Sequence, residues 1–182
     1  MFKKMKGFTL IELLIVIAII GILAALLIPN AMTAIQKAKQ KGTMKDINTI
    51  VTAMIDYTTD HGVAITADGS ALTPGAVPYS DLSPFYVKVL PLNDQWGHPF
   101  LLYGGLACAA VPTGITEAEL GPDDSLAASP GRNDAMDTFV WVKDTPESNL
   151  TQLSNMEGFN VDLVNWNGTW VSGPSSRTAS GT

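Results

Sequence analysis

The feature that most constrains this chain is an apolar run near its N-terminus. Between Phe8 and Ile28 only Thr9 and Glu12 are polar. At about 1.5 Å per residue, a helix of this length spans roughly 30 Å, the thickness of the hydrocarbon core of a bilayer. The run therefore predicts a membrane-spanning helix. The carboxylate of Glu12 needs an explanation, because a charge in lipid is costly unless it is paired or protonated.

The residues that precede the run argue against an ordinary secretory signal. The stretch MFKKMKG carries three lysines and no acid, and the apolar run follows it at once. A secretory signal has a shorter apolar region and then a cleavage site of small residues. We therefore expect the run to stay on the mature protein. A cleaved signal and a plain N-terminal anchor are the alternatives.

Beyond Pro29 the hydrophobic pattern becomes amphipathic. The apolar residues follow i, i+3, i+4, i+7 spacing, which is typical of one buried helix face: Ile47, Ile50, Val51, Met54 and Tyr57. The pattern predicts one long helix over residues 8–59. Its second half is expected to pack on a head domain, whereas its first half needs lipid or other copies of itself.

The remaining chain predicts a small head of mixed structure. We expect a loop over 60–78, a short helical turn in YSDLSPFYVKVLP, strands in HPFLLYGG and DTFVWVKD, and a hairpin in GFNVDLVNWNGTWVSG whose Asn-Gly pair makes the turn. The fold class is therefore α+β. The expected organisation is a leader over 1–7, the long helix over 8–59 with its membrane part at 8–28, a head over 60–173 and a flexible tail over 174–182.

Charge and composition exclude several functions. Residues 46–182 hold four basic and 16 acidic residues, a net charge of −12, so we expect the head to bind no nucleic acid. With Cys108 as the lone cysteine, no intrachain disulfide can form. The sequence has no phosphate-binding loop, no Cys-x-x-Cys and no His-Glu-x-x-His motif, and its two histidines lack a nearby nucleophile. The chain is not expected to be an enzyme.

The junction between leader and run resembles a known signature. Lys-Gly followed by FTLIE and an apolar run resembles the prepilin motif of the type IV pilin superfamily. The resemblance implies cleavage between Gly7 and Phe8 and N-methylation of Phe8. It also implies the pilin fold, in which a long helix packs on a small antiparallel sheet. Glu12 would then neutralise the new amine of a neighbouring subunit during assembly, and Pro29 matches a helix-kinking proline of the family.

A second resemblance lies in the head. PFYVKVLPLNDQWGHPFLLYG is similar to a stretch of the major pseudopilin of type II secretion systems, and it keeps Pro91, Asp94, Trp96, Gly97 and Pro99. Gln95 stands where that pattern has proline, and His98 where it has asparagine. The alternative is a generic aromatic turn, since turn chemistry alone accounts for glycine and proline.

Pseudopilins of this kind hold a calcium ion in the C-terminal sheet. ASPGRNDAMDT and VDLVNW are loosely similar to that site, and its oxygen ligands would come from Asn133, Asp134, Asp137 and Asp162. Solvated acids in a surface loop are the alternative. No other cofactor is implied.

The resemblances imply a structural subunit of a pilus-like filament, most similar to a type II secretion pseudopilin that drives protein export. The implied partners are copies of itself, other pilin-like subunits, the prepilin peptidase, the inner-membrane assembly platform and the cytoplasmic ATPase. Its location before assembly would be the bacterial inner membrane, which it would cross once, with the head in the periplasm; the filament would lie in the periplasm or at the cell surface. The alternatives are a type IV pilus pilin, serving adhesion, motility or DNA uptake, and a membrane-tethered periplasmic binding domain.

Overall fold

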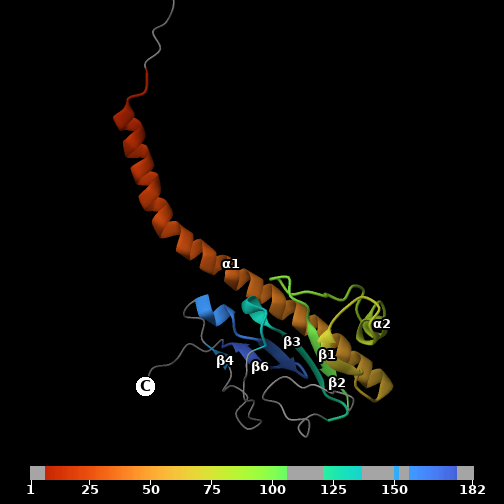
Figure 1. The fold of residues 1–182 in the computed structure, drawn as a ribbon. Coiled ribbons are helices and arrows are strands. Elements are labelled where there is room, and N and C mark those ends of the chain that lie inside the picture. Colours follow the sequence, from red (N-terminus) through yellow and green to blue (C-terminus); the bar gives the residue numbers. More distant parts are fainter. Residues whose placement is uncertain (1–6, 106–120, 137–149, 152–155, 176–182) are drawn as a thin grey trace, which may run out of the picture. The chain divides into compact units, whose positions relative to one another are not determined.

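The computed structural model describes residues 7–105, 121–136, 150–151 and 156–175. Its longest element is α1, Leu10–His61, which has 52 residues and confirms the predicted long helix within the usual uncertainty of helix ends. The chain divides into two compact units, one up to Lys37 and one from Ala38 onward, and each is described by itself (Figure 1).

The first unit is the N-terminal part of α1. Its large apolar side chains are exposed, from 46% of the surface of Val16 to 83% of that of Leu10. The helix is long and apolar enough to cross a membrane. It does not end at Pro29, although a proline inside a helix cannot donate a backbone hydrogen bond to the preceding turn.

The second unit contains the rest of α1, a short helix α2 (Val77–Leu82) and one sheet. Five strands are antiparallel in the order β1-β2-β3-β5-β6, and β4 adds to β6 in parallel. Their bounds are Ala67–Ala71 (β1), Leu101–Gly104 (β2), Ser125–Ser129 (β3), Leu150–Thr151 (β4), Leu163–Trp166 (β5) and Thr169–Pro174 (β6). The α+β fold class predicted from the sequence is confirmed.

The C-terminal hairpin forms as its Asn-Gly pair predicts. Asn167 and Gly168 connect β5 and β6 with positive φ angles of 48° and 86°, as a type I′ turn requires. The Asn167 side chain also accepts a hydrogen bond from the Ser125 backbone N–H at 2.8 Å. The turn is therefore tied to the start of β3.

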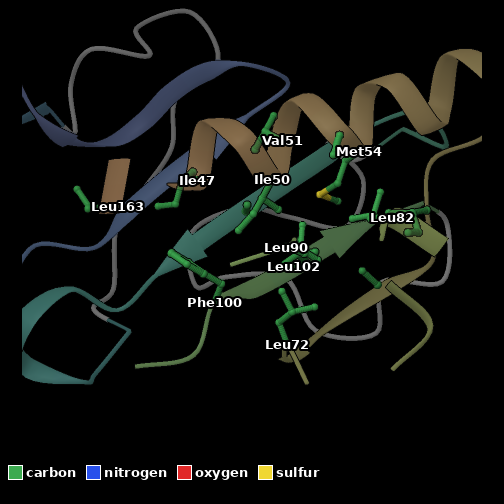
Figure 2. Close-up of a cluster of buried hydrophobic side chains, with 14 residues drawn as sticks. Ile47, Ile50, Val51, Met54, Leu72, Leu82, Leu90, Phe100, Leu102 and Leu163 are labelled. Carbon is green, nitrogen blue, oxygen red and sulfur yellow. The ribbon is translucent and has the colours of Figure 1, made fainter. Parts of the chain in front are cut away.

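The head core lies between α1 and the sheet. Ile47, Ile50, Val51 and Met54 are buried, and they pack in one cluster with side chains from the sheet and from the segments that lead to it, among them Leu82, Leu90, Phe100, Leu102 and Leu163 (Figure 2). Tyr57, the last member of the predicted stripe, is half-buried. Burying such side chains contributes about 1.5–3 kcal/mol each, so this cluster holds the second half of α1 on the sheet.

Three strands lie where no strand was expected: β1, β3 and the two-residue β4. β1 falls inside the predicted loop over 60–78; its sequence ADGSA has little strand preference. Gly69 is required there because a Cβ would overlap the ring of Tyr103 on β2. β3 is fully buried, and its residues apart from Leu126 are small, so it lacks the alternation that reveals a strand. The strand expected in DTFVWVKD and the flexible tail lie almost entirely outside the described residues.

Candidate functional site

The first candidate site is the start of α1. Thr9 precedes the helix, and its backbone N–H and its hydroxyl donate to Glu12 Oε2 at 2.9 and 2.8 Å. The Glu12 backbone N–H points back to Thr9 Oγ1 at 3.3 Å. This reciprocal arrangement is a capping box, in which two backbone donors of the first turn are satisfied by side chains.

The capping box gives Glu12 a role within its own chain. Phe8 lies before the helix, which begins at Leu10. The acid sits in the first turn, where the helix dipole favours negative charge. Glu12 thus has an intrachain role that sequence reasoning missed, although Thr-x-x-Glu before an apolar run is its recognised signature.

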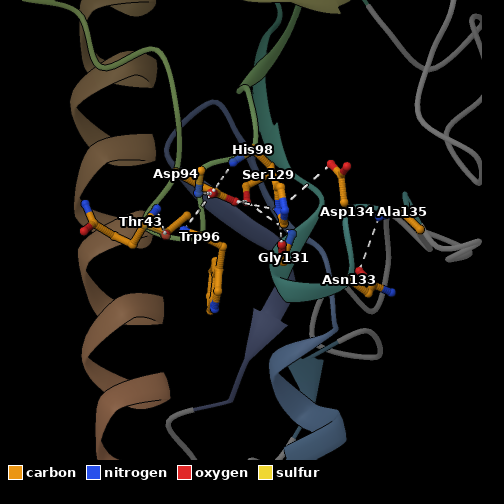
Figure 3. A network of polar contacts seen from close by, with 11 residues as sticks. Thr43, Asp94, Trp96, His98, Ser129, Gly131, Asn133, Asp134 and Ala135 are labelled. Atoms are coloured by element: carbon orange, nitrogen blue, oxygen red, sulfur yellow. Dashed lines mark hydrogen bonds and ion pairs between the residues drawn. The ribbon is translucent and has the colours of Figure 1, made fainter.

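The second candidate site is the loop of the DQWGHP motif in the head. Asp94 is buried, and its Oδ1 accepts hydrogen bonds from the backbone N–H groups of Trp96, Gly97 and His98 at 2.8–2.9 Å (Figure 3). Gly97 has a φ of 101°, a conformation that favours glycine. One carboxylate oxygen therefore fixes the whole turn.

The other oxygen of Asp94 ties this turn to the sheet. Ser129 Oγ, at the end of β3, donates to Asp94 Oδ2 at 2.8 Å and accepts from the Gly131 N–H at 3.2 Å. His98 Nδ1 lies 2.8 Å from the Gly131 carbonyl oxygen, so this nitrogen is the protonated one. The network joins the motif loop to β3 and to the short 3₁₀ helix Gly131–Asn133.

Both departures from the pseudopilin pattern make contacts of their own. The Gln95 backbone N–H donates to Thr43 Oγ1 at 3.2 Å, and its side-chain amide donates to Asp46 Oδ2 at 3.0 Å. A proline in this position could make neither bond. His98 supplies the bond to Gly131 described above. Gln95 and His98 thus link the motif loop to α1 and to the segment after β3.

The other motif residues have packing roles. Trp96 packs, half-buried, against the core cluster, and Pro99 forms an isolated bridge with Asn93 that closes the turn. Pro91 is half-buried just ahead of it. The partners Thr43, Ser129 and Gly131 could not have been found from the sequence, because they lie more than 30 residues from the motif.

The predicted calcium ligands are only partly brought together. Asn133 Oδ1 accepts from the Ala135 N–H at 3.4 Å, and Asp134 Oδ1 lies 4.0 Å from His98 Nδ1. Asp162 is buried just before β5, and Asp137 lies outside the described residues. Within the described ranges no three His, Cys, Asp or Glu side chains form a metal-binding group. Calcium binding stays a prediction that depends on Asp137.

Comparison with known proteins gave a family match at the N-terminus and relatives that match much of the chain. Residues 2–28 match the family model of the prokaryotic N-terminal methylation motif. The type II secretion system core protein G of Escherichia coli (strain K12) is 33% identical over 135 residues, which cover 70% of this chain and 83% of that protein. The chain belongs to the type II secretion core protein G family. It is thus identified as a major pseudopilin, and both resemblances stated from the sequence are confirmed.

Other members of the core protein G family extend the match. The protein of Vibrio cholerae is 29% identical over 170 residues, covering 91% of this chain and 94% of its own length. That of Pseudomonas aeruginosa is 36% identical over 104 residues, covering 54% of this chain and 72% of its own length. No solved structure gave a significant match. The exposed apolar helix and the family together indicate that the protein is anchored in a membrane.

Proposed function

We propose that this protein is the structural subunit of a helical pseudopilus that drives protein export by type II secretion. The observation that carries the proposal is the first unit: an apolar helix of membrane length whose large apolar side chains are exposed within the described unit and whose only carboxylate sits in its first turn. Such a surface is costly in water and is covered either by lipid or by the same helix of other copies.

The proposed path begins in the inner membrane. A prepilin peptidase cuts between Gly7 and Phe8 and methylates Phe8, while the head lies in the periplasm. An assembly platform and a cytoplasmic ATPase then extract subunits into a filament of this protein and other pilin-like subunits. The subunit itself catalyses nothing, and its helices over 8–28 form the filament core.

Glu12 has a specific role in this scheme. Its carboxylate enters a low-dielectric environment with two neutral donors from Thr9, so an unpaired negative charge is still present. The amine of the next subunit's Phe8 would pair with it. Because other axial positions leave both charges unpaired, the pair would select one register between subunits.

The N-terminal chemistry is tested by mass spectrometry of the protein purified from its membrane. A chain that begins with methylated Phe8 is expected, and a Glu12→Gln variant serves as a matched control that should still be cut. A mature protein that keeps residues 1–7, or one that has lost the apolar run, contradicts the proposal.

The export role is tested by deleting the gene. Loss of secreted proteins, restored by the wild-type chain, is expected for a secretion pseudopilin. Retained secretion together with loss of surface pili would assign the chain to a type IV pilus instead.

A helix exchange separates a filament subunit from a tethered binding domain. Residues 8–28 are replaced by an unrelated membrane helix of equal length, and secretion is measured. We expect secretion to be lost, because the filament core is made of this helix. Full activity of the exchanged protein would show that the helix serves only as a tether.

A further inference from the structure

One exposed face of α1 in the second unit carries opposite charges at its two ends. This face, here named the charged strip, consists of Lys41, Lys45, Asn48, Thr49, Thr52 and Asp56, all of which are exposed. Their spacing of three or four residues places them on one side of the helix. The strip borders an open groove of about 570 Å³ whose lining includes Met44, Ala53 and Val87.

The lysines at the basic end of the charged strip form no salt bridge within the described residues. Within the described part of the chain, the salt bridges involve only His98, so neither Lys41 nor Lys45 is paired. Asp56 follows Lys45 by eleven positions, which correspond to about 16 Å along the helix. That exceeds the screening length of about 8 Å at physiological salt, so the two ends do not neutralise each other within one chain.

The acidic end combines carboxylates with an aromatic surface. Tyr86 lines the groove beside Asp56, and its hydroxyl donates to Asp60 Oδ2 at 3.0 Å. Desolvation raises the pKa of Tyr86 above its ordinary value, and the hydrogen bond to Asp60 and the charges of Asp60 and Asp56 add to this effect. A negative potential beside an aromatic ring is the environment that an ammonium group prefers.

We propose that the charged strip, together with the exposed Asp60 one turn beyond Asp56, is an interface between two copies of this protein, in which Lys41 and Lys45 of one subunit face Asp56 and Asp60 of the next. Copies inserted into one membrane enter it in the same direction, so their α1 helices are parallel. If one helix is shifted along its axis relative to the next, the basic end of one strip meets the acidic end of the other. The two surfaces in contact differ, and such a heterologous contact repeats into an open helical array. The inference rests on the proposed function, since it requires a filament.

Charge reversal tests this contact. Lys45→Glu and Asp56→Lys are each expected to reduce filament formation about tenfold, because charge pairs across interfaces are commonly coupled this strongly. When both changes are combined in one chain, the acidic position 45 of one copy faces the basic position 56 of the next, so the charges are again opposite. Filament formation should then return to near the wild-type level. Lys88→Glu, which changes an exposed lysine outside the strip, is the control for net charge and should have no effect.

Cross-linking gives an independent readout. In a Cys108→Ser background, a chain with Lys45→Cys and a tagged chain with Asp56→Cys are expressed together and treated with a short bismaleimide. A cross-linked pair is expected, whereas Glu157→Cys, exposed on another element, should give none with either partner.

The outcomes separate the inference from the proposed function. Suppose that the wild-type chain assembles but Lys45→Glu forms as many filaments as Lys88→Glu, or that the double variant forms no more filaments than the single variants. The strip is then not the interface, and the filament role stands. If the wild-type chain carries methylated Phe8 and still forms no filament, both proposals fail. Circular dichroism of each variant verifies that the fold is intact.

Discussion

The two roles of Glu12, as a helix cap and as a charge partner, can be separated by substitution. Glu12→Gln keeps a side-chain oxygen that can accept from the Thr9 N–H and hydroxyl, but it removes the charge. Thr9→Val removes the hydroxyl from the capping box and keeps the charge. The two variants therefore change one role each, at neighbouring positions of the same turn.

The expected effects differ by more than an order of magnitude. Loss of a capping side chain costs about 1 kcal/mol of helix stability. Two unit charges about 4 Å apart interact by about 4 kcal/mol at an effective dielectric constant of 20, which corresponds to roughly a thousandfold in association. A helix of 52 residues tolerates the first loss easily. We therefore expect Thr9→Val to assemble almost normally and Glu12→Gln to be cut but not assembled.

The assay compares filament yield with N-terminal processing in the same cells. Sheared filaments are quantified by immunoblot, and mass spectrometry verifies that both variants begin at residue 8. If both are processed and Thr9→Val is as defective as Glu12→Gln, the carboxylate acts through the helix cap and the charge-pair argument is wrong. Normal filaments from Glu12→Gln would refute it as well.

Four further predictions concern the head. Asp94→Ala leaves three backbone N–H groups without their acceptor and should lower the free energy of unfolding by about 3 kcal/mol in urea titrations. Gln95→Pro restores the family residue but loses the bond to Thr43, so a loss of about 1 kcal/mol is expected in the same assay. Asp60→Asn should lower the pKa of Tyr86, which an NMR pH titration measures. Because the pKa of Tyr86 is raised in the folded state, Tyr86 contributes to stability below its unfolded-state pKa, and this contribution is lost as the pH rises through its folded-state pKa. Calorimetry should detect calcium binding to the full chain, and the absence of heat would remove the predicted site.

The sequence was most informative where periodicity was strong. The stripe of α1 predicted its buried face, because four positions in register must all meet the sheet. The Asn-Gly pair predicted the hairpin, since few other residues accept two successive positive φ angles. β1 and β3 were missed because their strand state comes from pairing with β2 and β5, and their small residues carry no pattern of their own.

The site residues likewise divide into local contacts, which the sequence pattern indicates, and distant contacts, which it does not. The resemblance placed Asp94, Trp96 and Gly97 in one motif, and in the structure their contacts with one another are local. It did not indicate that Asp94 also reaches Ser129, because that contact depends on how β3 is placed. The sequence pattern therefore predicted the turn, and only the structure shows what the turn is attached to.

The capping box also bears on what cleavage leaves behind. Thr9 and Glu12 set the start of α1, and the expected cut lies before Phe8, outside the hydrogen-bonded turn. Precursor and mature protein would therefore share the same first turn and the same helix register in the membrane. Cleavage would expose an amine two residues ahead of a helix that is already complete, so the chemistry of the terminus could change while the packing surface offered to other subunits stays constant.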